Sequence, residues 1–459
     1  MKSVLKAFSV LALSGAVVMP ALAGDDQKDL KKVIEDQGIN YVETAQKGIT
    51  LSGYVDTSYT YQFAGKGEYA QGGNFGIPVG APLQNPGLTG PGNAHAALRQ
   101  FDTSNNTFNI NAVKIALEKA LPDKNEWAAG FRIDTIYGED AKYLGDTALN
   151  GNAGFGAINN SGIALEQALV KFRVPVGNGL DIYMGKFVTF LGYEVIESPA
   201  NLNFSRGLLF TNAIPLTHTG IYADYKFNDT IEAKFGIVDG WNNSTSGSVG
   251  TFSGAGVLTT SGTNDSSSFG KAITGQLTIN APGKNANITQ SFIYSPEGEP
   301  GVVGVDNGPV VVYDIWGNWN PTFVKDNALL LGFNVDFGYN GASGTPALPT
   351  ITTPGILAGA TPGLNDSNTW WGTALYAQYK FNKVFSLAGR LEYLHEDAGV
   401  FQKFAGSGNT DDYSGTLTAS FNIWDNLLTR IEYRHDELDL GAPGGTQQDE
   451  ISLNAVYSF

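Results

Sequence analysis

Glu450–Phe459 reads EISLNAVYSF, and this stretch decides the fold class. Apolar side chains stand at every second position, at Ile451, Leu453, Ala455, Tyr457 and Phe459. A two-residue period places alternate side chains on opposite faces of a β-strand. One face therefore suits lipid and the other suits water. The same alternation recurs over residues 49–63 and 328–339, far away in the sequence.

The length of these stretches separates a membrane barrel from a soluble sheet. Strands of soluble sheets average about five or six residues, whereas the alternation here runs for about ten to twelve, as a tilted membrane strand requires. No run of about 18 apolar residues could cross a membrane as a helix. A spanning chain of this kind must form a closed barrel, because open strand edges leave unpaired amide groups in hydrocarbon.

Short and long connections alternate along the chain. Short ones such as 175–179 carry Pro, Gly, Asn or Asp, which is typical of periplasmic turns, whereas long ones such as 64–107 and 242–268 are Gly- and Ser-rich, as in outer loops. We therefore expect an all-β, antiparallel up-and-down transmembrane β-barrel of about sixteen strands over residues 49–459. The predicted strands are 49–63, 108–118, 126–137, 164–174, 180–187, 218–227, 231–241, 271–280, 286–295, 310–319, 328–339, 371–381, 385–395, 412–423, 427–436 and 450–459.

The first residues predict export. Lys2 and Lys6 precede an apolar stretch and an Ala21-Leu22-Ala23 cleavage site, so residues 1–23 are predicted to be a signal peptide. The destination is then the outer membrane of a Gram-negative-type bacterium. Residues 24–48 form a leader in which a helical pattern predicts a short periplasmic helix. This leader could be solvated and without a role, or it could act as a plug or as an oligomerisation arm.

Composition excludes several functions. The chain has no Cys, so disulfides and thiolate chemistry are absent, and its net charge of −16 disfavours nucleic acid as a partner. No nucleophile aligns with any of the four His residues, so we expect neither an enzyme nor a cofactor. His395 and His435 could touch a metal together with Asp411, but we interpret them as ordinary residues of the rim.

A barrel of sixteen strands leaves an aqueous lumen, which the polar face of each strand should line. Frequent charges on that face are costly to bury unpaired. Two roles are open for them: ion pairs that stiffen the wall, or a transverse field that selects solutes by charge. The candidates on the wall are Arg132, Asp134, Lys171, Arg173, Lys186, Arg390, Glu392, Arg430, Glu432 and Arg434.

One outer connection differs from the others. Residues 188–217, VTFLGYEVIESPANLNFSRGLLFTNAIPLT, are aromatic and aliphatic rather than Gly- and Ser-rich, so they should pack on something. We expect this loop to fold into the lumen and narrow it, with Glu194, Glu197 and Arg206 opposite wall charges such as Lys186. The alternatives are that it caps the mouth or docks against a neighbouring subunit.

The same region resembles a known family. LEQALVKFRVPVGNGLDIYMGKFVTFLGYEVIESPANLNFSRGLLF at 165–210, HTGIYADYKFNDTIEAKFGIVDGWNN at 218–243 and GYVDTSYTYQF at 53–63 resemble the OmpL-like family of β-barrel outer-membrane porins, also described as β-barrel porin type two. The chain departs from the family at Asp239, where the family usually has Asn. The resemblance implies an outer-membrane, porin-like channel and names no substrate.

These observations predict a porin for passive diffusion of small hydrophilic solutes or ions. Its other partner is outer-membrane lipid, and a homotrimer is compatible with a barrel of this size. The alternative is a non-conducting barrel that acts as a surface adhesin or as a scaffold for a periplasmic redox partner. The chain itself could not carry electrons through a CxxCH haem site, because it lacks Cys.

Overall fold

The structure, a computed structural model, describes residues 48–63, 101, 106–122, 125–144, 162–241, 251–252, 258–259, 271–296, 309–341, 368–397, 409–439 and 446–459. The predicted signal peptide 1–23 and almost all of the predicted leader 24–48 lie outside these residues, as do most of the long outer connections. Both N-terminal assignments stay predictions. Thr50–Phe459 form one compact unit, which holds the barrel.

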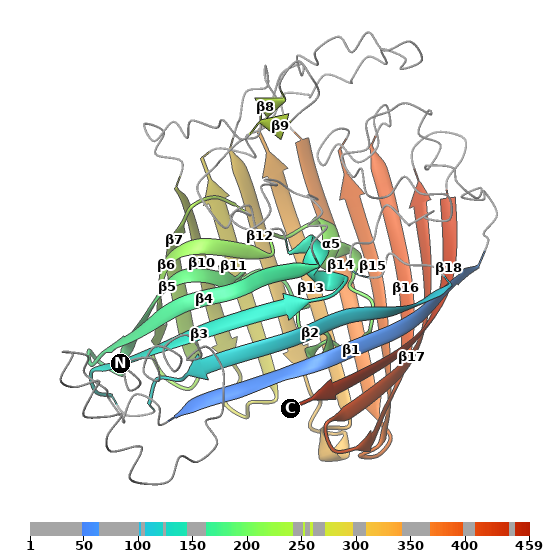
Figure 1. Cartoon of the computed structure of the whole chain (residues 1–459), viewed down its shortest axis with the longest axis horizontal. Helices are drawn as coiled ribbons and strands as arrows, with labels where there is room; N and C mark the ends of the chain where they lie inside the picture. Colours follow the sequence, from blue (N-terminus) through green and yellow to red (C-terminus); the bar gives the residue numbers. More distant parts are fainter. Residues whose placement is uncertain are drawn as a thin grey trace, which may run out of the picture. The chain divides into compact units, whose positions relative to one another are not determined.

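Within the described residues, sixteen strands close into one antiparallel barrel, which confirms the predicted fold class (Figure 1). Neighbours around the barrel follow the sequence, except that β10 pairs with β7, because β8 (Thr251–Phe252) and β9 (Leu258–Thr259) form a separate two-stranded sheet. The barrel strands are β1 (Ile49–Phe63), β2 (Thr107–Lys119), β3 (Ala128–Tyr137), β4 (Ile163–Val174), β5 (Leu180–Val188), β6 (Thr217–Lys226), β7 (Ile231–Val238), β10 (Ala272–Asn280), β11 (Ala286–Ser295), β12 (Val310–Trp319), β13 (Leu329–Asn340), β14 (Asn368–Lys380), β15 (Phe385–Glu396), β16 (Thr410–Trp424), β17 (Leu427–Asp439) and β18 (Thr446–Ser458).

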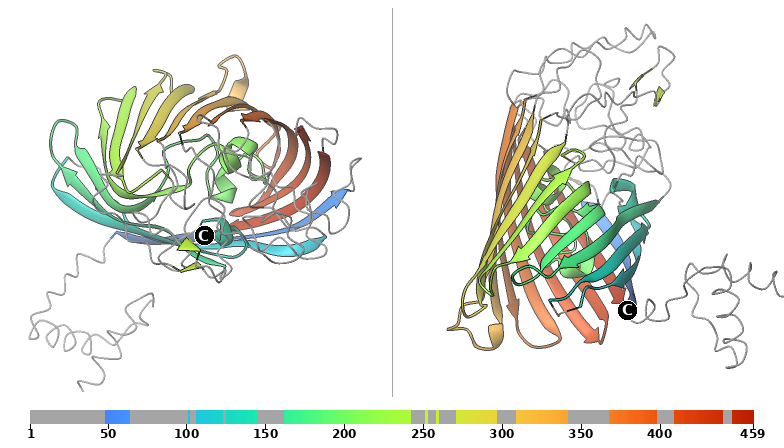
Figure 2. Two further views of the ribbon diagram at one scale, coloured as in Figure 1. Left: turned by 90° about the horizontal axis from the view of Figure 1, so that it is seen from above. Right: turned by 90° about the vertical axis from the view of Figure 1, so that its left-hand side faces the viewer.

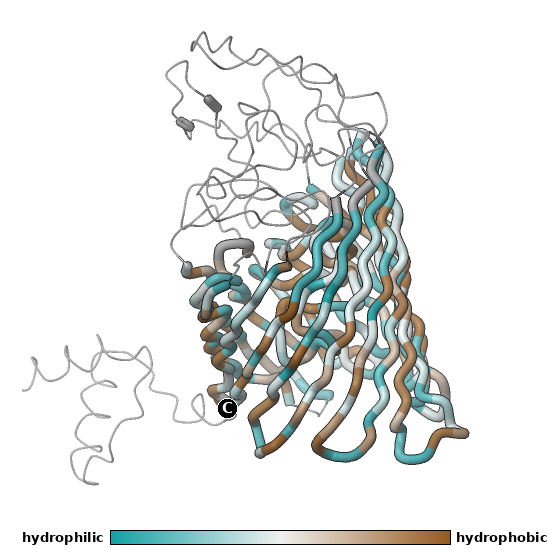
Figure 3. The backbone as a smooth tube through the Cα atoms, turned by 90° about the vertical axis from the view of Figure 1, so that its right-hand side faces the viewer, coloured by the Kyte–Doolittle hydropathy of each residue, from teal (hydrophilic) through white to brown (hydrophobic). Residues whose placement is uncertain are grey.

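The polar and apolar residues that alternate in the sequence face the inside and the outside of the barrel, respectively. Hydrophilic and hydrophobic residues alternate along the strands (Figure 3), and on β15 the inward Arg390 and Glu392 are buried while the outward Leu391 is 65% exposed. An exposed apolar face is what a lipid-facing barrel wall requires. Aromatic side chains meet across strands near the strand ends, as in the Tyr393–Tyr413 pair with ring centroids 5.1 Å apart. Such rows suit the level of lipid headgroups.

Helices are few among the described residues. α5 (Leu208–Asn212) is accompanied by the single 3-10 turns η2 (Asp140–Tyr143), η3 (Ser198–Ala200) and η4 (Lys325–Asn327). In the described part of the chain, no helix combines the length and the apolar character needed to cross a membrane. Viewed along the barrel, α5 lies inside the ring of strands (Figure 2). The interior is therefore occupied by chain from the connection that precedes β6.

Candidate functional site

The connection between β5 and β6, residues 189–216, lies inside the barrel (Figure 2), and we name it the inner segment. Gly192 has a φ of +94°, a conformation that suits glycine, and a Cβ there would lie 2.4 Å from Cδ1 of Ile214. Leu208 and Leu209 on α5 are almost fully buried. The aliphatic composition that made this connection unusual is therefore used for packing.

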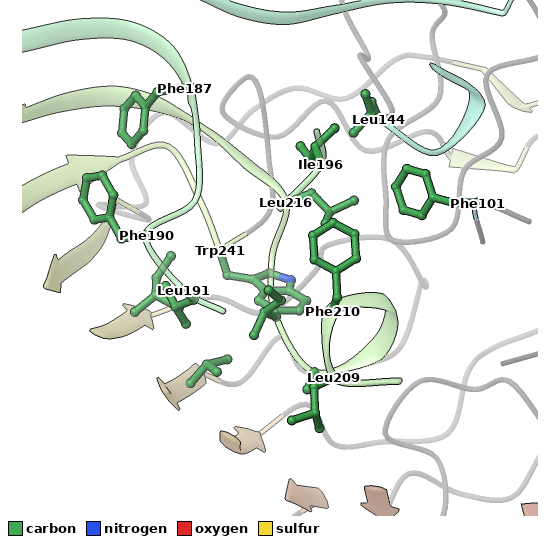
Figure 4. Packing of buried hydrophobic residues seen from close by; sticks show 14 of the residues in the cluster. Phe101, Leu144, Phe187, Phe190, Leu191, Ile196, Leu209, Phe210, Leu216 and Trp241 are labelled. Atoms are coloured by element: carbon green, nitrogen blue, oxygen red, sulfur yellow. The ribbon is translucent and has the colours of Figure 1, made fainter. Parts of the chain in front are cut away.

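A hydrophobic cluster fixes α5. Phe210 of α5 lies 5.6 Å from Phe101 between ring centroids, and Trp241 and Leu209 pack nearby (Figure 4). The indole Nε1 of Trp370 on β14 donates to the backbone oxygen of Ala213 at 3.0 Å. Burial of one Leu side chain stabilises a fold by about 1.5–3 kcal/mol. Packing thus holds the C-terminal part of the inner segment against the wall.

Three wall arginines donate to backbone oxygens of the inner segment. Nη1 of Arg430 donates to the Ser198 oxygen at 3.1 Å, and Nη1 of Arg390 donates to the Ser205 oxygen at 2.7 Å. Nη1 of Arg434 donates to the oxygen of Arg206 at 2.6 Å. An irregular segment leaves its carbonyl oxygens without regular partners, and a guanidinium with five donors can satisfy several of them. The three guanidinium groups are consequently buried rather than open to water.

Carboxylates bind the backbone N–H groups of the same stretch. Glu432 accepts from the backbone nitrogens of Phe204 at 2.6 Å and Ser205 at 2.9 Å. Glu194 accepts from Gly207 N at 2.5 Å, and its other oxygen lies 2.6 Å from Nη1 of Arg390. Arg390 Nε is also 2.8 Å from a carboxylate oxygen of Glu392. β15 and β17 therefore hold the inner segment through both donors and acceptors of its backbone.

On the other side of the inner segment, Lys114 of β2 lies among three carboxylates. Its Nζ is 2.5 Å from Glu197, 3.0 Å from Glu166 and 3.2 Å from Asp134. Ligand oxygens of these three acids lie within 4.8 Å of one another, a spacing that could suit a metal ion. The ammonium group already supplies the counter-charge there, so we assign the cluster as an ion-pair network. Burial alone would raise the pKa of Glu197, but Lys114 outweighs burial and holds that pKa below its usual value.

A β-bulge builds this cluster. Asp134 pairs with Gln167 and Thr135 pairs with Leu165, which leaves Glu166 as the extra residue of β4. Glu166 and Gln167 are both buried although they are adjacent in sequence. A bulge redirects one side chain out of the strict alternation. The period-two pattern that predicts the strands could not reveal Glu166, and it gave no partner for Lys114.

One example given for the partners of the loop needs correction. Glu194 and Glu197 do face wall charges, as expected, but these charges are Arg390 and Lys114 rather than Lys186. Lys186 is buried and lies opposite Ala168 of β4 and Thr219 of β6 in the register. The physical reason is that the inner segment leaves β5 and reaches across the lumen. Register along β5 therefore does not set its contacts.

The remaining predicted site residues take different positions. Arg206 lies within the inner segment, donates to the oxygens of Phe204 and Ile196, and is 3.7 Å from Asp140. On the wall of β3–β5, Arg132 pairs with Asp134 at 2.8 Å and Arg173 pairs with Asp181 at 2.6 Å. Lys171 pairs with Glu118. As residues that line a passage, all of these stay predictions.

At the rim, the two histidines do not share an aspartate. Nδ1 of His395 is 2.7 Å from Asp411, whereas Nδ1 of His435 is 2.8 Å from Asp449. Each Asp also accepts a hydrogen bond from a Tyr hydroxyl, of Tyr393 or Tyr433. Among the described rim residues, His435 therefore does not join His395 and Asp411, and the three do not form the metal site that the sequence suggested.

Comparisons with known proteins agree with this architecture. Residues 48–459 match the family described as "Putative beta-barrel porin-2, OmpL-like". None of the curated proteins matches the sequence. Similar solved structures include the outer membrane channel DcaP of Acinetobacter baumannii, with a TM-score of 0.53, 10% identity and coverage of 90% of this chain and 97% of that one.

Two further structures share the fold. OprB of Pseudomonas putida has a TM-score of 0.52 at 13% identity and covers 92% of this chain and 97% of its own. The anion-selective porin from Comamonas acidovorans has a TM-score of 0.50 at 10% identity, with coverage of 90% and 99%. At such identities these likenesses speak for the fold alone. The family match spans the whole barrel, so the chain belongs to the OmpL-like β-barrel porin family of the outer membrane.

Proposed function

We propose that this porin lets small hydrophilic solutes or ions diffuse passively through a water-filled lumen narrowed by residues 188–217. The observation that carries the proposal is an asymmetry of burial on the inner wall. The inward charges of β15 and β17 are buried against the inner segment. On the opposite wall Lys114 and Lys186 are buried as well, but the side chains of Arg132 and Lys234 are 30% and 24% exposed. Solvent-exposed charges on an inner wall favour a passage along β2–β7.

The wall charges then divide into two roles. Arg132 and Arg173 border the passage and, with Glu118 and Asp181, give it paired charges of both signs, while the buried Lys171 pairs with Glu118. Arg390, Glu392, Arg430, Glu432 and Arg434 act through the inner segment, because they hold it in place. Both roles expected for the wall charges are then used. Charges on β15 and β17 stiffen the barrel, and charges along β2–β7 select solutes.

A second function has one observation in its favour. The inner segment makes hydrogen bonds to β10, β13, β15 and β17, for example from Gln276 to the oxygen of Phe190 and from the Tyr193 nitrogen to Asn334. A segment attached around so much of the wall also suits a sealed barrel. Such a barrel would serve as a surface adhesin or as a scaffold for a periplasmic redox partner.

Single-channel recording separates the two functions. The protein purified from outer membranes would be inserted into planar lipid bilayers, and current steps would be recorded, followed by the reversal potential in a salt gradient. Stable open steps are expected for a porin. A correctly folded barrel that gives no steps would overturn the proposal and favour the scaffold.

The assembly and the export of the chain belong to the same proposal. We expect a homotrimer in the outer membrane and removal of residues 1–23 during export. The mass of the protein in mild detergent, measured by light scattering with correction for bound detergent, tests the first. N-terminal sequencing of the mature protein tests the second, and a start at Gly24 is expected.

A further inference from the structure

Asp314 on β12 and Asp336 on β13 form a carboxyl pair that the ion-pair network does not reach. They are directly opposite each other in the strand register, and both are fully buried. Among the described residues, no Lys or Arg forms a salt bridge with either carboxyl group. Two carboxylates this close cannot both be ionised in a buried site without a counter-charge.

The surrounding donors distinguish the two acids. Asp314 accepts a hydrogen bond from Nδ2 of Asn334 at 2.7 Å. Asp336 receives only a longer contact from the same amide, at 3.4 Å. Donors stabilise an ionised carboxylate, so Asp314 is the better acceptor and Asp336 the better proton carrier. The Asn334 N–H also points toward Asp314, which disfavours a metal ion as the counter-charge.

One oxygen of each acid, Oδ2, is buried and lacks a donor among the described residues. Oδ1 of each acid faces the same Asn334 amide, and because no described cation pairs with either acid, one of the two carboxyl groups must carry a proton. We infer that Asp314 and Asp336 share one proton, and that this proton keeps the turn at Gly192 and Tyr193 docked against β12 and β13. The consequence for the passage rests on the proposed function, since it concerns the segment that narrows the lumen.

The pair touches the inner segment directly. Asn334, which donates to Asp314, accepts from the backbone nitrogen of Tyr193 at 2.8 Å. The hydroxyl of Tyr193 donates to Asn318 at 2.7 Å, and its ring stacks on Tyr376 at 4.1 Å. Loss of the shared proton would place two adjacent charges under this turn. Water must then enter, and the turn is displaced.

Other groups around the pair do not titrate in its place. Burial raises the pKa of the Tyr193 hydroxyl above its usual range, so this group stays neutral. Glu194, the next residue of the inner segment, is paired with Arg390. β11 contributes the uncharged Ser291 opposite Asp314, and β14 contributes Tyr376. The pH response of this turn therefore belongs to Asp314 and Asp336.

Conductance as a function of pH tests the inference. For the unmodified protein, we expect conductance to rise at alkaline pH, when the shared proton is lost. Asp336→Asn supplies a permanent donor to Asp314 and should abolish this rise. Glu232→Gln removes one inward carboxylate on the distant strand β7 and should keep it. If conductance does not rise at alkaline pH in the unmodified protein, or rises equally in Asp336→Asn, the inference is overturned. The proposed porin function is unaffected by either result.

Infrared spectroscopy gives a readout that needs no conduction. A folded barrel at neutral pH should show the C=O stretch of a buried protonated carboxyl group, and this band should be lost in Asp336→Asn but kept in Glu232→Gln. If Asp336→Asn does not fold, Asp314→Asn gives the second test: the proton then stays on Asp336 but no longer faces a carboxylate, so the band should shift in frequency, and an unshifted band would refute the shared proton. If the protein forms no channels at any pH but shows the band, the proposed function is overturned and the shared proton is supported. Absence of the band in the unmodified protein would refute the shared proton.

Discussion

Glu194 of the inner segment and Arg390 of β15 form an ion pair at 2.6 Å in which both side chains are almost fully buried. The pair joins chain inside the barrel to the barrel wall, and Arg390 bonds Glu392 as well. Buried pairs of this kind contribute little compared with an apolar contact, yet removal of one partner is costly because the other charge stays buried. Substitution of one partner therefore tests how strongly this ion pair attaches the inner segment to the wall.

Arg390→Leu should destabilise the protein. The substitution leaves Glu194 and Glu392 buried without their cation, which costs about 3–5 kcal/mol. Equilibrium unfolding in urea would measure the change. Lys226→Ala is the control, because Lys226 and Asp229 form an exposed pair whose loss should cost less than about 1 kcal/mol. Equal effects of the two substitutions would contradict the assignment of Arg390.

Glu432→Gln should raise the single-channel conductance. The carboxylate accepts from two backbone N–H groups, of Phe204 and Ser205, and an amide has only one oxygen to offer them. The inner segment should loosen there while the strands stay paired. Asp449→Asn, at the rim on β18, removes a carboxylate that bonds His435 and Tyr433 and not the inner segment, and serves as the control. Unchanged conductance in Glu432→Gln would show that this contact does not position the constriction.

Gly192→Ala should undock the turn that faces β12 and β13. The new Cβ would lie 2.4 Å from Ile214 at a positive φ, and strain of this type costs about 1–3 kcal/mol. Urea unfolding and conductance should both change. Gly389→Ala is a matched control on the wall, where the nearest atom to a new Cβ is 3.9 Å away.

Acid should release a different part of the inner segment. The pKa of Glu197 is held low by Lys114 in spite of burial. A lowered pKa gives stability that is complete above the usual Glu value and is lost as the pH falls through the lowered one. Conductance should therefore stay constant in mild acid and change only under strongly acidic conditions. Glu197→Gln should remove that acid response, and a response that persists would assign it to another group.

The strands could be predicted because the lipid-facing and inward faces of each strand produce an alternation of apolar and polar residues. This alternation does not reach the start of β18: we predicted that the strand begins at residue 450, but pairing begins at Thr446, opposite Leu438. Backbone pairing continues there through polar residues, and polar residues carry no alternation. Alternation thus locates the part of a strand that faces lipid and misses its polar extension.

The candidate site was less accessible from sequence. The sequence showed that residues 188–217 are unusual and named Glu194, Glu197 and Arg206, but it could not supply their partners. Partners such as Lys114 depend on how far the segment reaches across the lumen, and Glu166 depends on a bulge. The Asp314–Asp336 pair requires the register of β12 with β13, which the spacing within one strand does not determine.

Closure of the ring has a consequence for biogenesis. β1 pairs with β18, and Asn454 donates to Asp56 across a sequence separation of 398 residues. Until these two strands meet, a partly assembled barrel has two open edges, and neither can remain unpaired in hydrocarbon. Hairpins between neighbouring strands form from local contacts, but among the described strands the pairing of β1 with β18 joins the parts of the chain that lie farthest apart in sequence. During assembly, the edges of β1 and β18 must therefore be kept out of hydrocarbon until all intervening strands have formed. The pairing of these two strands, rather than any hairpin, then completes the barrel.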